Sequence, residues 1–320
     1  MAATPDRQQL KLDQAARAAW LYYVAGDTQE QIADKLGISR PAAQRMIAFA
    51  VSERLVRVEV TRPIASCAAL AETLTARFGL QICDVQPSDP TDPASMTQGV
   101  ALAAALRLEA EIANPAPVVI GLTTGRALRA MVEQVTPASR PQHRLVSLVG
   151  SIGRDASANR FEVVMRLADR LGCRCYPRPM PLVAETEDER NLYAAQRAHL
   201  TLNDLAEKAR LSLVGISDVS WDGPLHVDGF LTDEELNELS EQQAVGEIAG
   251  WAFDREGRLI DGSFNRRVLS APLRPGPGRT VVAIGGGARK VQPIAAALRG
   301  RLISGLITDE DTAAAVVATL

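Results

Sequence analysis

Two short segments of this 320-residue sequence have residue types that can hold an anion. In the first, IGLTTGRA, an apolar run ends at Leu122 and is followed by Thr123, Thr124 and Gly125 before a helical pattern begins. Two hydroxyls, backbone amides and the positive end of the next helix suit a phosphate or a cluster of hydroxyls. The segment therefore predicts an anion-binding turn. The alternative is a tight strand-to-helix turn that needs glycine only for its shape.

The second segment, AIGGGARK, places three glycines, residues 285–287, directly after an apolar run. Glycine lets a ligand approach the backbone closely, and Lys290 supplies a cation three residues later. Neither segment has the spacing of a P-loop or of the G-x-G-x-x-G dinucleotide motif. A turn shaped only by its glycines is again the alternative.

Cysteines and histidines form no pattern typical of metal or disulfide sites. The four cysteines include one C-x-C pair, Cys173 and Cys175, and no C-x-x-C, and the three histidines are isolated. The sequence therefore predicts no metal site and no cofactor. No histidine lies in or near either anion turn, so neither turn has an evident general base.

The stretch TQEQIADKLGISRPAAQRM predicts two short helices joined by a tight turn. Thr28 and the glutamine three residues later have the spacing of a capping box, and Gly37 ends the first helix. Ser39 stands at the cap position of the second helix, with Pro41 in its first turn. This is the pattern of a helix-turn-helix, and an αα-corner inside a helical domain is the alternative.

The second helix has an apolar inner face and a polar outer face. Helical periodicity groups Ala43, Met46, Ile47 and Ala50 on the inner face. Arginine and glutamine form paired hydrogen bonds with guanine and adenine edges in the major groove, and helix starts can hold phosphates. The predicted DNA-binding residues are Thr28, Gln29, Ser39, Arg40, Gln44 and Arg45.

Two flanking segments complete the predicted head. A helix over residues 10–24 is expected to complete a three-helix core with Leu12, Ala15, Ala16, Ala19, Trp20 and Tyr23. The alternating segment LVRVEV, residues 55–60, predicts a short strand in the position of a wing. We therefore expect a DNA-binding domain over residues 1–62.

Composition and charge agree with a soluble protein of two domains. The chain is 47% hydrophobic, has no run of eighteen apolar residues and begins with a polar segment, so the predicted location is the cytoplasm. Residues 1–62 contain nine Lys and Arg against seven Asp and Glu, and the rest contains 26 against 31. A head of charge +2 thus precedes a body of charge −5, which suits a polyanion-binding module on an acidic body.

Beyond the head, strand-like apolar runs alternate with helical patterns. This alternation predicts an α/β body, residues 63–320, built on a doubly wound, mainly parallel sheet that binds a ligand at the carboxyl ends of its strands. The amphipathic helix over residues 67–80 either pairs subunits through its apolar stripe or packs on its own body. The strand-like runs are residues 117–122, 144–150, 173–183, 211–217, 280–287 and 302–308.

Five segments, taken in order, resemble the SorC family of bacterial transcriptional regulators of sugar catabolism. They are the helix-turn-helix region, IGLTTGRAL, LVGSIGR, AVGEIAGWAFDREGRLIDGSFNRRVLS and AIGGGARKVQPIAAALRGRLISGLITDEDTA. The resemblance covers nearly the whole chain, and the motifs G-G-x-x-K, I-x-A-A-L-R-G and G-L-I-T-D-E of the last segment are its most specific part. The recognition helix departs from the family, because RPAAQRM replaces R-x-x-V-S-R-L.

The resemblance implies a body similar to ribose-phosphate isomerases and glucosamine-phosphate deaminases. It also implies a sugar phosphate as effector, with an unphosphorylated sugar or a polyol as alternatives, and assembly into dimers or tetramers. For the two carboxylates in the implied set, capping a helix or pairing with an arginine is the alternative role. The implied effector-binding residues are Thr123, Thr124, Gly125, Gly150, Asp218, Glu247 and Lys290.

Two functions from different classes follow. The first is a transcriptional regulator that binds operator DNA, a small effector and further copies of itself. The second is a sugar-phosphate isomerase or deaminase with an appended DNA-binding head. The absence of a grouped acid and base beside the anion turns favours the regulator over the enzyme.

Overall fold

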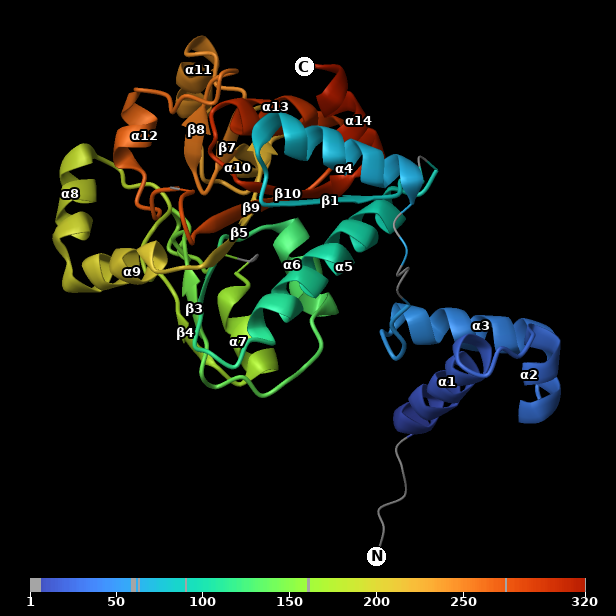
Figure 1. The fold of residues 1–320 in the computed structure, drawn as a ribbon. Coiled ribbons are helices and arrows are strands. Elements are labelled where there is room, and N and C mark those ends of the chain that lie inside the picture. Colours follow the sequence, from blue (N-terminus) through green and yellow to red (C-terminus); the bar gives the residue numbers. More distant parts are fainter. Residues whose placement is uncertain are drawn as a thin grey trace, which may run out of the picture. The chain divides into compact units, whose positions relative to one another are not determined.

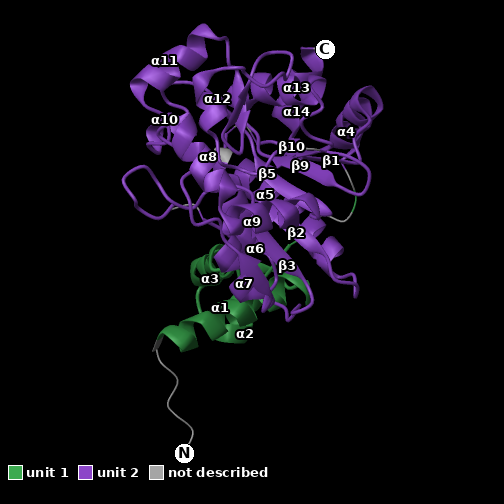
Figure 2. Ribbon diagram, turned by 90° about the vertical axis from the view of Figure 1, so that its left-hand side faces the viewer, with its two compact units in different colours: residues 1–63 green, residues 64–320 purple. Residues whose placement is uncertain are grey.

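The computed structural model describes residues 7–58, 62, 64–89, 91–159, 162–273 and 275–319. It divides into two compact units, Met1–Pro63 and Ile64–Leu320, drawn in different colours in Figure 2.

The first unit contains the predicted helix-turn-helix. Its helices are α1 (Arg7–Tyr23), α2 (Gln29–Leu36) and α3 (Arg40–Ser52). The capping box is present, since Thr28 Oγ1 accepts from the amide of Gln31 at 3.3 Å and Gln31 Oε1 accepts from the amide of Thr28 at 2.8 Å. Gly37 ends α2 in the left-handed conformation, with φ of 65°. Ser39 occupies the cap position of α3, but its side chain makes no capping hydrogen bond.

The core of this unit is built largely from alanine. Ala15, Ala18 and Ala19 of α1 are buried, and α2 and α3 add Ile32, Ala33, Ala43, Ile47 and Ala50. The prediction that Trp20 and Tyr23 lie in this core is wrong, because their exposed fractions are 56% and 41%. The small side chains of α1 let α1 and α3 pack closely, and the aromatic rings lie off that face.

The prediction of a strand over residues 55–60 is wrong for the part of this segment that the structure describes. Leu55–Val58 form no strand, and residues 59 and 60 lie outside the described residues.

The second unit has the predicted doubly wound sheet. Every pair of neighbouring strands is parallel, in the order β1-β10-β9-β5-β2-β3-β4. The sequence analysis missed β1, a single short run between two helices. The strands are β1 (Ile82–Gln86), β2 (Val119–Leu122), β3 (Arg144–Ser147), β4 (Arg174–Tyr176), β5 (Leu211–Gly215), β9 (Thr280–Ile284) and β10 (Gly305–Asp309).

Helices cover both faces of this sheet. One face packs on α5 (Pro93–Ile112), α6 (Arg126–Gln134) and α7 (Val164–Leu171). The other packs on α4 (Ala65–Phe78), α9 (Arg197–Glu207), α13 (Val291–Arg299) and α14 (Glu310–Ala318). Figure 1 shows α4, α13 and α14 on the opposite side of the sheet from α5, α6 and α7. Strand residues alternate between the two cores because side chains alternate along a strand: Val281 and Ala283 face one, Val282 and Ile284 the other.

Helix α4 packs on its own unit, which is the second of the two alternatives for the segment 67–80. Cys67 and Leu74 belong to the core beneath the sheet, and Leu70, Ala71 and Phe78 pack against it.

A small antiparallel sheet accompanies the large one. It has the order β6-β7-β8, with β6 (Ser217–Asp218), β7 (Gly246–Ile248) and β8 (Trp251–Phe253). Short helices surround it: α8 (Glu187–Ala195), α10 (Pro224–Val227), α11 (Asp233–Glu241), α12 (Ser263–Arg267) and the 3-10 turn η1 (Ala288–Lys290).

The strand order reverses between β2 and β5. From β2 the chain adds β3 and β4 toward one edge, and from β5 it adds β9 and β10 toward the other. In open α/β sheets a ligand binds at such a reversal, outside the carboxyl ends of the strands. The amide of Gly215, at the end of β5, donates to Thr123 Oγ1, just beyond β2, at 2.8 Å, so the reversal lies at the first predicted anion turn.

Candidate ligand-binding site

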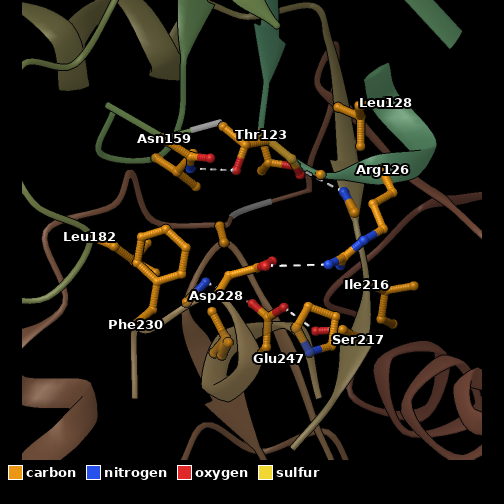
Figure 3. A pocket seen from close by; sticks show the side chains of 18 of the residues that line it. Thr123, Arg126, Leu128, Asn159, Leu182, Ile216, Ser217, Asp228, Phe230 and Glu247 are labelled. Atoms are coloured by element: carbon orange, nitrogen blue, oxygen red, sulfur yellow. Dashed lines mark hydrogen bonds and ion pairs between the residues drawn. The ribbon is translucent and has the colours of Figure 1, made fainter. Parts of the chain in front are cut away.

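A cavity of about 210 Å³ lies at this reversal. It is lined by the turn after β2, the segment after β3, the end of β5, the small sheet and the segment around α10. Figure 3 shows Thr123 and Asn159 facing Ser217 and Glu247 from opposite sides of it.

The predicted turn 123–125 forms one wall. Thr123 is buried, and its hydroxyl accepts from the amide of Gly215, so this side chain fixes the turn to β5. Thr124 Oγ1 accepts from Asn159 Nδ2 at 3.2 Å, which leaves the hydroxyl proton of Thr124 able to donate. Gly125 has φ of 132°, a conformation that residues with a side chain rarely adopt.

Helix α6 begins at this wall with its positive end. Arg126, Ala127 and Leu128 line the cavity, and no side chain of the described residues caps the first turn of α6. Unpaired amides and the helix dipole at such a start favour an anion. An anionic ligand group would be stabilised here.

Two cations, Lys290 and Arg126, and two carboxylates, Glu247 and Asp228, line the cavity. Lys290 is half-buried, and within the described residues its ammonium group has no hydrogen-bond partner and no carboxylate within 4 Å. Burial lowers the pKa of Lys290, while Glu247 and Asp218 oppose that shift. Arg126 NH2 lies 3.2 Å from Asp228 Oδ1, and Figure 3 shows this ion pair crossing the cavity.

Glu247 is the buried carboxyl of the site. Burial raises its pKa, and hydrogen bonds to its two oxygens act in the opposite direction. Ser217 Oγ donates to Glu247 Oε1, and the amide of Gly250 donates to Oε2 at 2.8 Å. A carboxyl with a raised pKa holds a proton more readily, so it can donate to a ligand hydroxyl as well as accept from one.

An apolar patch lies beside these polar groups. Leu182, Ile216, Leu225 and Phe230 line the same cavity. A few placed polar groups within an otherwise apolar lining are typical of small-molecule sites.

Six of the seven predicted effector residues line this cavity: Thr123, Thr124, Gly125, Gly150, Glu247 and Lys290. Gly150 also has a packing role, because a Cβ atom there would lie 2.3 Å from the carbonyl oxygen of Met180. The seventh, Asp218, does not line the cavity. Its carboxylate instead lies 2.9 Å from Arg289 NH2 and accepts from Ser220 Oγ at 2.6 Å.

The second predicted anion turn borders a neighbouring cavity of about 140 Å³. Gly285 and Gly286 line that cavity, together with Arg126, Lys290 and Asp309. Gly286 is required there because a Cβ atom would lie 1.6 Å from Asp309 Oδ2. Of the second turn, only Lys290 reaches the larger cavity.

Sequence reasoning missed Arg126, Asn159, Asp228 and Phe230. Arg126 directly follows the predicted turn, and its position at the start of α6 was a usable signal. The other three lie in segments without regular periodicity, whose position depends on tertiary contacts.

The predicted DNA-reading residues gather at the starts of α2 and α3. Thr28, Ser39, Arg40, Gln44 and Arg45 are exposed and Gln29 is half-buried, while Ala43, Ile47 and Ala50 face the core as expected. No acidic residue occupies the first turn of α3, so this exposed face combines a helix start with two arginines.

The described residues contain no group of three His, Cys, Asp or Glu side chains arranged to hold a metal ion. A search of the same residues finds no helix with the length and apolar character needed to cross a bilayer.

Comparison with known proteins relates both units to one group. Residues 62–318 match the family model of a putative sugar-binding domain. The chain is 34% identical to the erythritol catabolism regulatory protein EryD of Brucella abortus (strain 2308), over 95% of this chain and 96% of the relative. It is 26% identical to the deoxyribonucleoside regulator of Bacillus subtilis (strain 168), over 98% of both chains.

A solved structure gives the same fold over nearly the full length. The full-length sorbitol operon regulator SorC from Klebsiella pneumoniae aligns with a TM-score of 0.71 and 24% identity, covering 98% of this chain and all of that one. The helix-turn-helix, the doubly wound sheet and the sequence matches over both units lead to one conclusion: the chain belongs to the SorC family of sugar-binding transcriptional regulators.

Proposed function

We propose that this protein regulates transcription of genes for sugar or polyol catabolism, and that a small hydroxylated ligand carrying a phosphate controls its binding to operator DNA. The observation that carries the proposal is the cavity at the strand reversal. It combines the start of α6, which no side chain of the described residues caps, with two cations, Arg126 and Lys290, and with Glu247 for hydroxyl groups. The name of the relative EryD, a regulator of erythritol catabolism, supports a short polyol or its phosphate as the ligand.

The head supplies the DNA contacts in this proposal. Arg40, Gln44 and Arg45 are exposed on α3 and have the side chains that read base edges, while Thr28, Gln29 and Ser39 stand at helix starts suited to phosphates. Self-association supplies the second head that a DNA site with two half-sites requires. A protein that binds bacterial operator DNA acts in the cytoplasm.

We propose a regulatory role without catalysis. Glu247, the buried acid of the cavity, has both oxygens engaged by Ser217 and Gly250, and no histidine occurs among the described residues that line the cavity. Isomerisation or deamination needs a base that is positioned to remove a proton from the substrate. The site therefore suits binding better than proton transfer.

A two-step experiment tests the function. Erythritol, erythritol 4-phosphate and a panel of other polyols and sugar phosphates are screened for an increase in melting temperature. A specific ligand at a hundredfold excess over its Kd should stabilise the protein by about 2.7 kcal/mol.

The second step uses duplex DNA selected by the protein from a random pool. A ligand that stabilises the protein should change its affinity for this DNA at least about tenfold, a coupling of about 1.4 kcal/mol. A protein that selects no DNA sequence, or whose stabilising ligands all leave DNA affinity unchanged, would contradict the proposal. Conversion of a stabilising ligand, followed by NMR, would instead support the enzyme.

A further inference from the structure

One wall of the cavity is a segment with little regular secondary structure. Residues 219–231, here named the strap, connect β6 to α11 and contain only the single turn α10. The strap places Pro224, Leu225, Asp228 and Phe230 against the cavity. Its outer side exposes Trp221 and Val227, with exposed fractions of 52% and 62%.

The strap's amides bond mainly within the strap itself. Those of Asp228, Phe230 and Leu231 donate to carbonyls of Pro224 and Leu225 at 2.8–3.0 Å. Side chains attach it to the rest of the unit: Leu225 and Leu231 are buried in the core, and Arg289 NH2 donates to Ser220 Oγ at 2.7 Å. Arg126 pairs with Asp228 at 3.2 Å, and Arg154 Nε donates to the carbonyl of Phe230 at 3.3 Å. A segment held in this way can open locally without unfolding the domain.

The pair Arg126–Asp228 joins the strap to the proposed anion site. Arg126 is the first residue of α6, so its guanidinium originates at the helix start where a phosphate would bind. The Asp228 side chain is only 10% exposed, whereas that of Arg126 is 56% exposed, so the carboxylate is shielded from water while the guanidinium stays accessible to an incoming anion.

We propose that Asp228 is an internal counter-ion of Arg126, that the phosphate of a ligand displaces it, and that this exchange releases the strap. The inference rests on the proposed function and extends it to the regulation of the same site. A phosphate competes with Asp228 for Arg126, since it can accept two parallel hydrogen bonds from one guanidinium. It also repels the carboxylate beside it. A neutral polyol does neither, so the strap responds to the charge of the ligand.

The test uses the full-length protein and inorganic phosphate as the probe, with chloride at matched ionic strength as the reference. Asp228→Asn removes the counter-ion and keeps the size of the side chain. Asp222→Asn is the matched control, because Asp222 lies in the strap but its side chain is 87% exposed and it does not line the cavity. Asp228→Glu retains the charge and serves as the rescue variant.

Two quantities are measured. Without phosphate, Asp228→Asn and Arg126→Gln should each speed amide hydrogen exchange in residues 219–231 about three- to tenfold, while Asp222→Asn and Asp228→Glu should stay near wild type. Asp228→Asn should also bind phosphate about tenfold more tightly than wild type, measured by calorimetry, because a competing anion is gone. Phosphate added to the wild type should speed exchange in the strap.

Each opposite result overturns the inference. These results are unchanged exchange in Asp228→Asn, equal or weaker phosphate binding by that variant, and slower strap exchange in wild type with phosphate. The experiment distinguishes failure of the proposed function from failure of the counter-ion exchange. If the strap responds as expected but no sugar phosphate alters DNA binding, the counter-ion exchange stands and the regulatory role falls. If sugar phosphates release DNA equally from wild type and Asp228→Asn, the role stands and the counter-ion exchange falls.

Discussion

At the scale of single residues, Lys290 and Glu247 are two charged groups of the proposed ligand cavity whose pKa values are shifted by burial. Burial disfavours the charged form of both groups, so it lowers the pKa of the lysine and raises that of the glutamate. The charge of each group favours the charged form of the other, but the two are too far apart to form an ion pair. An incoming anion supplies the partner that Lys290 lacks.

Lys290→Ala should therefore weaken binding of a phosphorylated ligand about ten- to a hundredfold, the effect of losing a charged hydrogen bond. Binding of the same ligand without its phosphate should change much less. Calorimetry with both ligands measures the difference, and Lys208→Ala, which removes an exposed lysine of the same unit, is the control. An equal loss for the two ligands would assign Lys290 a structural role.

Glu247 should make the stability of the ligand-free protein depend on pH. Its raised pKa means that the folded state binds more protons than the unfolded state just above the ordinary pKa of 4.5. The free energy of unfolding should then fall as pH rises from the ordinary to the raised pKa. Denaturant titrations between pH 5 and about 8 should show this fall reduced in Glu247→Gln but not in Glu241→Gln, a change at an exposed site. Equal slopes in all three proteins would contradict the assignment.

The residues of the site divide clearly into those that sequence could identify and those that it could not. Thr123, Thr124 and Gly125 directly follow β2, Lys290 ends the turn after β9, and the parallel sheet brings such positions to one edge. Asp228 and Asn159 lie in irregular segments whose course depends on Arg126, Arg154 and other distant partners. Asp218 is the opposite case. Its place at a strand end predicted a role in the site, but its carboxylate pairs with Arg289 and does not line the cavity.

At the scale of elements, the two helices of the helix-turn-helix begin in different ways. At α2, the side chain of Thr28 accepts from the backbone amide of Gln31, and the side chain of Gln31 accepts from the backbone amide of Thr28. At α3, Ser39 occupies the equivalent position without a side-chain bond, and Pro41 in the first turn removes one amide that would need a partner.

This difference predicts unequal effects of two similar substitutions. Thr28→Ala should lower the free energy of unfolding of the head by about 1 kcal/mol, the usual cost of losing a helix cap. Ser39→Ala, the matched change at a cap position without a capping bond, should cost no more than a few tenths of a kcal/mol. Hydrogen exchange of α1–α3 amides measures both. Equal losses would mean that the capping box adds nothing to the stability of α2.

The outer face of α3 makes a separate prediction about DNA. Gln44→Ala and Arg45→Ala should each weaken binding to the selected operator by about 1 to 3 kcal/mol while leaving ligand affinity intact. Footprinting on DNA with single base changes should show relaxed specificity at the base that each side chain contacts. If both variants bind the operator as the wild type does, a different face reads the DNA.

Helices and strands, like the residues of the site, differ in how well the sequence predicts them. The helix-turn-helix and most of the parallel strands have caps, periodic apolar residues or buried runs of their own. Strands β6, β7 and β8 have only two or three residues each, and α10 has four, so tertiary contacts decide their conformation. In α1, Ala15 and Ala19 are buried as predicted, but Trp20 and Tyr23 are exposed, because small side chains alone close this core.

At the scale of the whole molecule, one helix-turn-helix reads too few base pairs to select a site in a genome. We predict a homo-oligomer whose heads contact half-sites about 34 Å apart, or a multiple of that distance. Because the apolar stripe of α4 packs on its own unit, we expect the surfaces that join subunits to lie elsewhere. Light scattering with and without ligand, and binding to operators of altered half-site spacing, measure both parts. A monomer on DNA that accepts every spacing would refute the prediction.

The pairing of β1 with β10 has a consequence for how the protein is made. Ile82 lies beside Gly305 in the sheet, so β1 waits for about 220 further residues to be synthesised before its neighbour exists. At about 5–20 residues per second, this interval lasts roughly 10 to 45 seconds. Throughout it the residues of the head have already been synthesised, while β1 has no strand to pair with. Each newly made copy therefore passes through a period in which its helix-turn-helix exists before the large sheet can be completed.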